Sequence, residues 1–578
     1  MAYRRFLCNL DLHPRTIENR NSTIENRPWW QTGVIYQIYP RSFFDANGDG
    51  IGDLDGIRRK LDYCSGTLGV DALWLSPFYP SPQKDFGYDV ADYTAVHSDY
   101  GTLADFDRLL SEAHERGLKI ILDFVPNHTS EEHDWFTESR SSKDSDKRDW
   151  YIWKDSVEGP DGQPGPPNNW LSNFGGSAWE WDETTEQYYL HLYLPGQPDL
   201  NWRNPEVQEA MFEQARFWLE RGADGFRIDV AHAIMKDPAF RDNPPNPSGE
   251  GFHKHRGAYD EQLHLYEEGH PDTHRVYRSF RRLLDGYSTD SDRIALGEMH
   301  IYDRGEWASY YGQPRADGTR DEMHLPINFA LLKADWTAAG VREVVDSLEA
   351  LLPRGAWPNY VLGNHDEPRL RTRLSPDGRD GEAEARQAAV LLLTLRGTPM
   401  LYYGDELGLE EVEIPPNEQL DPWGQNVPGL GRDGCRTPMP WTSESDTAGF
   451  SEASPDQLWR PVGEANRRRS VEAQIDDETS VLALYRRLLG LRRETPALHA
   501  GSYRPLDRGV PEGCFAYLRT GPDRDRVVAA INFTDEALTV PLPAEGALLL
   551  SSRLDRRDDT TGERLRLRPH EAAVVRIA

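Results

Sequence analysis

Three acidic residues stand where apolar, strand-like segments end, and side chains in such places can meet in one site. Asp229 lies near the end of segment 225–230, and Glu298 and Asp366 lie near the ends of two later segments. Carboxyl groups held close together can act as a nucleophile and as a general acid and base. Each acid taken alone is more typical of a helix cap or a solvated surface group. The three together point to chemistry that none of them indicates singly.

Arg227 stands two residues before Asp229. Because side chains alternate faces along a strand, the guanidinium and the carboxylate point the same way. A neighbouring positive charge lowers the pKa of an acid, so the spacing predicts an ionised Asp229, which suits a nucleophile. A structural ion pair at the end of a strand is the alternative interpretation.

These acids need elements that bring them together. From residue 29 onward, short apolar segments alternate with helix-like stretches. The alternation predicts an α/β fold, a (β/α)8 TIM barrel formed by residues 29–127 and 198–495. Active sites of such barrels lie at the carboxyl ends of the strands, where the three acids stand. The predicted strands are 34–39, 72–76, 119–124, 225–230, 294–299, 323–329, 360–362 and 399–403.

Other regions depart from the barrel pattern. Residues 128–197 lack helical periodicity, are rich in Trp, Gly, Pro and Asn, and predict a lid, subdomain B, inserted after the third strand. Short strands and turn residues in 496–578 predict a C-terminal antiparallel β-sandwich domain. Residues 1–28 contain the pentapeptide Thr-Ile-Glu-Asn-Arg twice and are interpreted as a loosely ordered N-terminal arm.

Composition limits the expected partners. The 578 residues carry a formal net charge of −31, which disfavours nucleic acid and anionic membranes. The chain has neither an apolar run long enough to span a membrane nor a secretory signal pattern, so a cytoplasmic location is expected. The four cysteines are far apart, which indicates reduced thiols. We expect a small-molecule partner and no membrane partner; the oligomeric state, monomer or weak homo-oligomer, stays open.

Five short motifs resemble those of a known enzyme family. Residues 123–128, 225–229, 297–298 and 364–366 are similar to the signature regions of glycoside hydrolase family 13, the α-amylase family. Residues 197–201 resemble a fifth region that is typical of its α-glucosidase and oligo-1,6-glucosidase subgroup. The order and approximate spacing match over about residues 30–578.

The resemblance implies a retaining hydrolase. Asp229 would be the nucleophile, with Arg227 beside it in the substrate-binding set, and Glu298 would be the general acid and base. Asp366 matches a third acid that holds hydroxyls of the distorted sugar ring. Crowding by the other two carboxylates is expected to raise the pKa of Glu298, as a general acid at neutral pH requires.

The resemblance also implies residues that bind the sugar. His128 and His365 match contacts to sugar hydroxyls, although a histidine of the core is the alternative for each. Tyr88 matches a tyrosine that stacks on the terminal glucose, Asp89 an acid that grips it, and Arg436 an arginine paired with that acid. A charged floor of this kind makes a dead-end pocket, so we expect exo-acting cleavage.

A loop after the first strand carries oxygen ligands at a spacing typical of a hard-cation site. Asp45, Asn47, Asp49, Asp53 and the carbonyl of Ile51 match the first part of an EF-hand loop, whose final glutamate is replaced by a glycine. The subgroup carries a structural calcium site in this loop, so we expect Ca²⁺ here, with Mg²⁺ as the alternative cation. An Asx-turn loop without an ion is the other interpretation.

The residues after Asp229 bear on linkage preference. In the subgroup, valine at the position of Val230 accompanies α-1,6 cleavage, but the continuation 231–233 departs from the oligo-1,6-glucosidase pattern. We therefore expect an α-glucosidase that releases glucose from maltose- and isomaltose-type oligosaccharides. An oligo-1,6-glucosidase is one alternative, and a transglycosylase or sugar isomerase such as a trehalose synthase or sucrose isomerase, with the same acids, is another.

Overall fold

The computed structural model describes residues 27–159, 162–247, 257–301, 303–375, 381–556 and 559–578. The predicted N-terminal arm, 1–28, lies almost wholly outside these residues, and so does Cys8. The other three cysteines, Cys64, Cys435 and Cys514, are free, buried thiols. Among the described helices, none combines the length and the apolar character that crossing a membrane demands.

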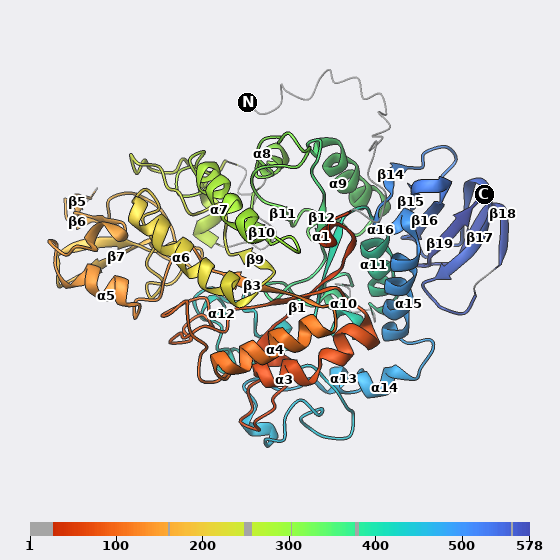
Figure 1. The fold of residues 1–578 in the computed structure, drawn as a ribbon, viewed down its shortest axis with the longest axis horizontal. Coiled ribbons are helices and arrows are strands. Elements are labelled where there is room, and N and C mark those ends of the chain that lie inside the picture. Colours follow the sequence, from red (N-terminus) through yellow and green to blue (C-terminus); the bar gives the residue numbers. More distant parts are fainter. Residues whose placement is uncertain (1–26, 160–161, 248–256, 302, 376–380, 557–558) are drawn as a thin grey trace.

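Eight parallel strands form a barrel at the centre of the molecule (Figure 1). They are β1 (Ile35–Ile38), β2 (Ala72–Leu75), β3 (Lys119–Phe124), β9 (Gly225–Ile228), β10 (Ile294–Met299), β11 (Leu325–Asn328), β12 (Asn359–Val361) and β13 (Thr398–Tyr402). Their order is β11-β10-β9-β3-β2-β1-β13-β12, and the end strands β11 and β12 lie in contact, which nearly closes the barrel. The predicted barrel and its eight strands are confirmed.

The strand residues alternate between two apolar environments. Ile35, Ile121 and Leu296 belong to a cluster drawn from most of the barrel strands, which fills the barrel interior. Tyr36 and Ile120 belong to the larger cluster beneath the surrounding helices. Strands buried on both faces are apolar almost throughout, which is why they read as continuous apolar runs in the sequence.

Helices cover the outside of the barrel. The long ones are α4 (Leu103–Glu115), α6 (Pro205–Arg221), α7 (Thr273–Tyr287), α9 (Ala338–Leu351), α11 (Glu382–Thr394) and α15 (Val481–Glu494). Shorter ones are α1 (Trp29–Thr32), α2 (Pro40–Phe43), α3 (Leu54–Arg59), the π-helix η2 (Tyr63–Leu68), α8 (Arg304–Ser309), α10 (Leu370–Arg373), α12 (Pro422–Asn426), α13 (Glu464–Arg467), α14 (Val471–Ile475) and α16 (Pro496–His499). The helix-like stretches expected between the strands are thereby confirmed.

Local sequence defines the segment that carries Asp229. Helix α6 begins at Pro205, after Asn204, whose side chain accepts a hydrogen bond from the N–H of Glu206. It ends at Gly222, whose φ of 109° is readily available only to glycine. The chain then turns directly into β9, so that Arg227 and the following residues reach the carboxyl end of the barrel.

Subdomain B lies where the third strand ends, as predicted. It contains α5 (Asp134–Ser141) and a three-stranded antiparallel sheet of β4 (Trp153–Lys154), β8 (Gln187–Leu190) and β7 (Trp179–Asp182). A small hairpin, β5 (Val157–Glu158) with β6 (Pro164–Gly165), extends it. Figure 1 shows subdomain B and the C-terminal sheet at opposite ends of the long axis.

The C-terminal unit is one hydrogen-bonded antiparallel sheet, whereas the sequence pattern predicts a β-sandwich. Its order is β14 (Ser502–Pro505), β15 (Cys514–Thr520), β16 (Arg526–Asn532), β19 (Ala572–Ile577), β17 (Leu538–Ser551) and β18 (Thr560–Leu567). Strand β17 is a single strand of 14 residues. Register shifts between Pro541 and Gly546 accommodate the turn-like residues between them without breaking the strand.

Candidate active site

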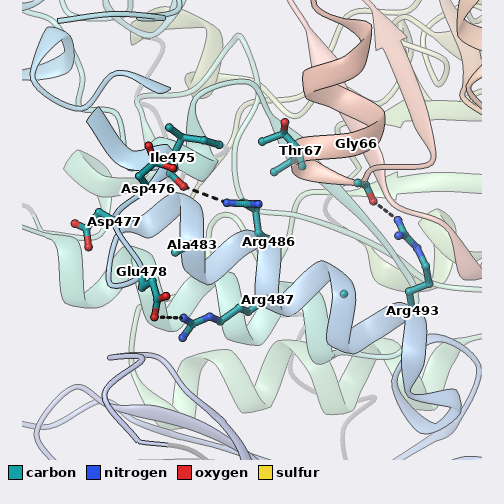
Figure 2. Close-up of a pocket in the computed structure, with 13 residues that line it drawn as sticks. Gly66, Thr67, Ile475, Asp476, Asp477, Glu478, Ala483, Arg486, Arg487 and Arg493 are labelled. Carbon is teal, nitrogen blue, oxygen red and sulfur yellow. Dashed lines mark hydrogen bonds and ion pairs between the residues drawn. The ribbon is translucent and has the colours of Figure 1, made fainter. Parts of the chain in front are cut away.

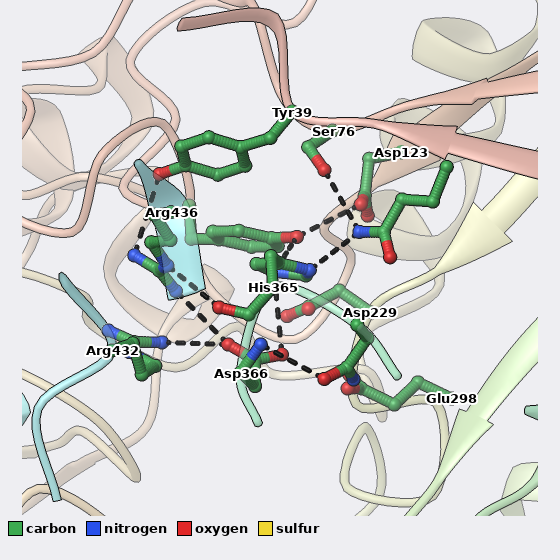
Figure 3. Close-up of polar contacts among 12 residues, drawn as sticks. Tyr39, Ser76, Asp123, Asp229, Glu298, His365, Asp366, Arg432 and Arg436 are labelled. Carbon is green, nitrogen blue, oxygen red and sulfur yellow. Dashed lines mark hydrogen bonds and ion pairs between the residues drawn. The ribbon is translucent and has the colours of Figure 1, made fainter. Parts of the chain in front are cut away.

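The three predicted acids meet at the carboxyl end of the barrel (Figure 3). Asp229 follows β9, Glu298 lies on β10, and Asp366 lies in the loop after β12. The structure adds a fourth acid, Asp123 on β3, which is fully buried. Strands of one parallel barrel present their carboxyl ends at the same rim, which explains how residues far apart in the sequence converge.

Arg227 lies at the centre of the acid cluster. Its Nη1 is 2.7 Å from Asp229 Oδ1 and 2.9 Å from Asp123 Oδ1, and its Nη2 is 2.7 Å from Glu298 Oε1. Two oxygens bound at such distances to the two terminal nitrogens of one guanidinium are no more than about 8 Å apart. The carboxyl groups of Asp229 and Glu298 therefore lie close together, within the range of separations found for the paired carboxyls of glycosidases.

Glu298 has further donors besides Arg227. The backbone N–H of Val230 donates to Glu298 Oε2 at 2.9 Å, and His300 Nε2 lies 3.2 Å from Oε1. Val230 has a φ of 33°, an uncommon conformation for a β-branched residue. Such strained backbone persists where the surrounding structure holds it, often beside an active site. Here the unusual conformation accompanies an N–H aimed at the predicted acid.

The pKa shifts in the free site run opposite to the prediction. Burial raises the pKa of Asp229 well above its usual range, although Arg227 opposes this effect. Burial also disfavours the charge of Glu298, but Arg227 and His300 offset it and lower the pKa of Glu298. The prediction treated Arg227 as the partner of Asp229 alone, whereas three carboxylates share its single charge. A proton held by the cluster therefore favours Asp229 before substrate enters.

Asp366 is held in its ionised form by the groups around it. Its Oδ1 is 3.2 Å from Arg432 Nη1 and 3.1 Å from Arg436 Nη2, and its Oδ2 is 3.4 Å from His365 Nε2. Burial disfavours ionisation, but these neighbours outweigh it and lower the pKa of Asp366. Asp366 is thus an ionised acceptor, and its role in holding sugar hydroxyls stays a prediction.

The predicted pairing of Asp89 with Arg436 is wrong. Both Asp89 oxygens serve its own loop: Oδ1 accepts from the Ser81 hydroxyl at 2.7 Å and Oδ2 from the N–H of Lys84 at 2.8 Å. The buried acid–arginine pair is instead Asp85 with Arg432, at 2.7 Å.

Arg436 still belongs to the site through its contact with Asp366. Asp85 stands four residues before Asp89 in the same loop, and the motif alone does not distinguish the two acids. Arg432 stands four residues before Arg436, and the motif alone likewise does not show which arginine pairs with the acid.

Tyr88 and His365 form a wall beside Asp123. Their rings stack with centroids 5.4 Å apart and an interplanar angle of 1°, and Tyr88 OH is 2.7 Å from His365 Nε2. Tyr88 OH also donates to Asp123 Oδ2 at 3.1 Å. Gln37 Nε2 lies 2.7 Å from His365 Nδ1. Burial lowers the pKa of His365 to about 3, so the ring is neutral at pH 7.

His128 is placed next to this wall. It is almost fully buried, and its Nε2 lies 3.2 Å from the carbonyl oxygen of Tyr88 and 3.2 Å from Gln197 Nε2. Burial lowers its pKa to about 4. Its ring packs at 5.2 Å from that of Tyr193 in subdomain B. The structure therefore brings His128 to the site, where it links the barrel rim to the lid.

The predicted metal loop is folded by hydrogen bonds of its own. Asp45 Oδ1 accepts from the N–H of Gly48 at 2.7 Å, and Asp53 accepts from the N–H of Ala46 at 3.0 Å and caps α3. Asp49 Oδ1 accepts from the N–H of Ile51 at 2.9 Å, and Asn47 Oδ1 from the N–H of Asp49 at 2.9 Å.

These contacts match the Asx-turn interpretation of the loop. Within the described ranges, no three His, Cys, Asp or Glu side chains form a group that could hold a metal. A site that also draws on Asn47 and the carbonyl of Ile51 is not tested by this absence, so the predicted Ca²⁺ stays a prediction.

Figure 2 shows a hollow of about 410 Å³ away from these acids, between η2 and the segment α14–α15. Its arginines already have partners: Arg487 lies 3.6 Å from Glu478, and Arg486 and Arg493 donate to backbone carbonyls. It shares no lining residue with the acid cluster. The chemistry of the chain therefore lies at the barrel rim.

The match of the whole chain to known proteins agrees with this geometry. The alpha-amylase catalytic-domain family matches residues 37–501. The chain belongs to the α-amylase family. It is 44% identical over 534 residues to a probable alpha-glucosidase of Rhizobium meliloti (strain 1021), covering 91% of this chain and 93% of that protein. It is 36% identical over 587 residues to an oligo-1,6-glucosidase of Parageobacillus thermoglucosidasius, covering 95% and 99%.

Solved structures of the α-amylase family are similar over the whole length. An alpha-glucosyl transfer enzyme superimposes with a TM-score of 0.88 at 42% identity, covering 96% of this chain and all (100%) of that one. The trehalulose synthase of Pseudomonas mesoacidophila MX-45 superimposes with a TM-score of 0.83 at 34% identity, with 96% and 100% covered. Enzymes with different products thus share this family member's architecture.

Proposed function

We propose that this family member is a retaining, exo-acting α-glucosidase that releases glucose from short α-glucosides of the maltose and isomaltose type. The observation that carries the proposal is the convergence of Asp229 and Glu298 on the two terminal nitrogens of Arg227, 2.7 Å from each. This convergence supports a nucleophile and an acid that face each other across one short gap, as a double displacement requires.

In the first step, a carboxylate oxygen of Asp229 attacks the anomeric carbon while the bond to the leaving oxygen breaks. Glu298 gives its proton to that oxygen, and the glucosyl unit remains as an ester of Asp229. In the second step, Glu298 takes a proton from water, the water oxygen attacks the same carbon, and Asp229 is released. Two inversions leave the product with the configuration of the substrate.

For this reaction the proton must lie on Glu298 rather than on Asp229. In the free site Arg227 holds Glu298 ionised, while burial favours a proton on Asp229. A sugar oxygen that approaches Glu298 offers an acceptor for a protonated carboxyl, and an ionised Asp229 keeps Arg227 at 2.7 Å. We infer that substrate binding moves the proton of the coupled carboxyls to Glu298.

Exo action is supported by a group of ion pairs that would close one end of the site. Arg432 joins Asp85, Asp366 and Asp421, at 2.7, 3.2 and 2.6 Å respectively. The guanidinium also lies 5.2 Å from the ring centroid of Phe174 in subdomain B. These contacts tie the loops after β2, β12 and β13 to the lid, and they leave the terminal glucose against a wall of hydrogen-bonding groups.

Sugar isomerisation by the same acids is the second candidate, since an alpha-glucosyl transfer enzyme and a trehalulose synthase share the fold. The experiment incubates the enzyme separately with maltose, isomaltose and sucrose and separates the products. Glucose as the main product from maltose supports hydrolysis. Trehalose from maltose, or isomaltulose or trehalulose from sucrose, as the main product would instead support the second candidate.

A further inference from the structure

The two carboxyl oxygens of Glu298 have different hydrogen-bond donors. Oε1 lies 2.7 Å from Arg227 Nη2 and 3.2 Å from His300 Nε2. Oε2 accepts from the backbone N–H of Val230 at 2.9 Å. An oxygen that faces a guanidinium and an imidazole N–H is the worse place for a proton, because both contacts favour a negative oxygen. A proton on Glu298 therefore rests on Oε2.

His300 is held rigidly in the orientation that makes this contact. Its ring stacks on Phe329 with centroids 4.9 Å apart and an interplanar angle of 2°. Phe329 follows β11 and is buried. The side chain of His300 keeps 28% of its surface exposed, so it lies at the rim of the barrel rather than in the apolar core.

A second histidine–carboxylate pair supports the ring of His300. The centroid of His232 is 5.9 Å from that of His300, and His232 Nε2 lies 3.3 Å from Glu268 Oε2. Glu268 also accepts from the Tyr259 hydroxyl at 3.0 Å. His232 belongs to the continuation 231–233, which departs from the oligo-1,6-glucosidase pattern.

The charge on His300 depends on groups from every neighbouring element. Burial lowers its pKa, and Lys333 and His232 act in the same direction, whereas Glu298 raises it. Glu268 and Glu306 face His232 from the loop before α7 and from α8. A neutral His300 with its proton on Nε2 donates to Glu298 Oε1 without adding a full positive charge.

We propose that His300 is a positioning residue for the general acid. Together with Arg227 it fixes Oε1 as the oxygen without a proton, so that Oε2 presents the acid proton to the leaving group. Phe329 and the pair of His232 with Glu268 hold the ring of His300 in place. This inference rests on the proposed function, because it assigns a role within glucoside hydrolysis.

The test compares two substrates that differ in their need for an acid. The leaving oxygen of maltose must be protonated, whereas 4-nitrophenolate leaves an aryl α-glucoside unaided. We expect His300→Phe, which keeps the stacking on Phe329 but loses the donor, to lower kcat for maltose by about 10- to 100-fold. The loss on 4-nitrophenyl α-glucoside should be several times smaller. His300→Gln, which keeps an N–H donor, should recover most of the loss.

The pH profile supplies a second readout. The N–H of His300 lowers the pKa of Glu298. Its removal in His300→Phe should raise that pKa and so move the alkaline limb of the kcat/KM profile for maltose to higher pH. The matched control is His114→Gln, because His114 pairs with Asp224 at 2.7 Å at the opposite end of β9. The control should leave unchanged both the ratio of the kcat values for the two substrates and the alkaline limb of the kcat/KM profile.

Equal losses on both substrates in His300→Phe, or no loss on maltose, would overturn the positioning role. If circular dichroism shows that His300→Phe does not fold, His300→Met serves as the variant without a donor, and the same comparison with His300→Gln decides. A wild-type enzyme that hydrolyses neither substrate would overturn the proposed function as well, so the two failures are distinguishable.

Discussion

Arg432 donates to Asp85 at 2.7 Å, and this buried ion pair joins the loop after β13 to the loop after β2. Both side chains are almost excluded from solvent, at 6% and 5% exposure. Arg432 keeps Asp366 and Asp421 as partners when Asp85 is removed, whereas removal of Arg432 leaves the buried carboxylate of Asp85 without its opposite charge, which costs about 3–5 kcal/mol. In the proposed site the pair closes the end that would receive the terminal glucose, so we expect it to affect both stability and substrate binding.

Asp85→Asn and Asp89→Asn should have different effects, although the two residues lie in one loop. Asp85 faces Arg432 and the sugar, so its change should lower kcat/KM for maltose by about 100-fold, the loss expected for a charged hydrogen bond. Asp89 holds only Ser81 and the loop backbone, so its change should lower the melting temperature and leave kcat/KM of the folded enzyme within a few fold. Kinetics and thermal melts of both variants check the prediction. The reverse pattern would restore Asp89 as the sugar-binding acid.

Asp229→Asn and Glu298→Gln should each abolish maltose hydrolysis while the protein stays folded. Without Asp229 no glucosyl ester forms, so 4-nitrophenyl α-glucoside should be lost as well. Without Glu298 the acid is missing, and the loss should reach about 100- to 10,000-fold on maltose but less on the aryl substrate. Initial rates with both substrates measure the difference. Turnover close to that of the wild type in either variant would remove its residue from the mechanism.

Acid should destabilise the enzyme in part through His133, which caps α5 in subdomain B. Burial lowers the pKa of His133 from 6.5 to about 4, so the unfolded chain binds a proton that the folded chain does not. The contribution of His133 to the free energy of unfolding is therefore fully present above about pH 6.5. It is lost as the pH drops toward 4, and the loss is roughly 3 kcal/mol at most.

His133→Asn keeps an acceptor for the N–H of Trp135 and does not titrate. Unfolding of both proteins by urea between pH 7 and 4.5 should show a smaller fall for the variant. Parallel curves would mean that His133 does not contribute.

The loop with Asp45 and Asp53 tests the predicted cation. If Ca²⁺ binds there, chelation with EDTA should lower the melting temperature and hardly change the kcat of enzyme that remains folded. Asp49→Asn keeps an acceptor for the N–H of Ile51 but removes a charged ligand, so it should weaken the response to EDTA. An unchanged melting temperature of the wild type with EDTA would reject the cation and leave the loop held by its Asx turns.

The barrel, its strands and the three acids were predictable because each depends on local pattern. Strands buried on both faces read as apolar runs, and a parallel barrel brings their ends together whatever lies between them. Asp229, Glu298 and Asp366 follow from that rule. The single strand β17 did not follow, because a register shift across its turn-like residues is decided by pairing with β18 and β19.

The partners of charged side chains were not predictable in the same way. Asp85 and Asp89 stand in one loop, and Arg432 and Arg436 in another, so only the folded loops decide which acid meets which arginine. The pKa shifts of Asp229 and Glu298 are opposite to those predicted from the sequence, for a related reason. Sequence spacing showed one neighbour of Arg227, whereas the fold gives it three carboxylates to neutralise.

The anomeric form of the first product tests the central claim most directly. A proton NMR time course of maltose hydrolysis, recorded before mutarotation equilibrates the anomers, identifies the glucose released from the nonreducing end. Attack by Asp229 followed by attack of water predicts that α-glucose is released first. Release of β-glucose would show a single inversion and would contradict the roles of Asp229 and Glu298 as nucleophile and acid.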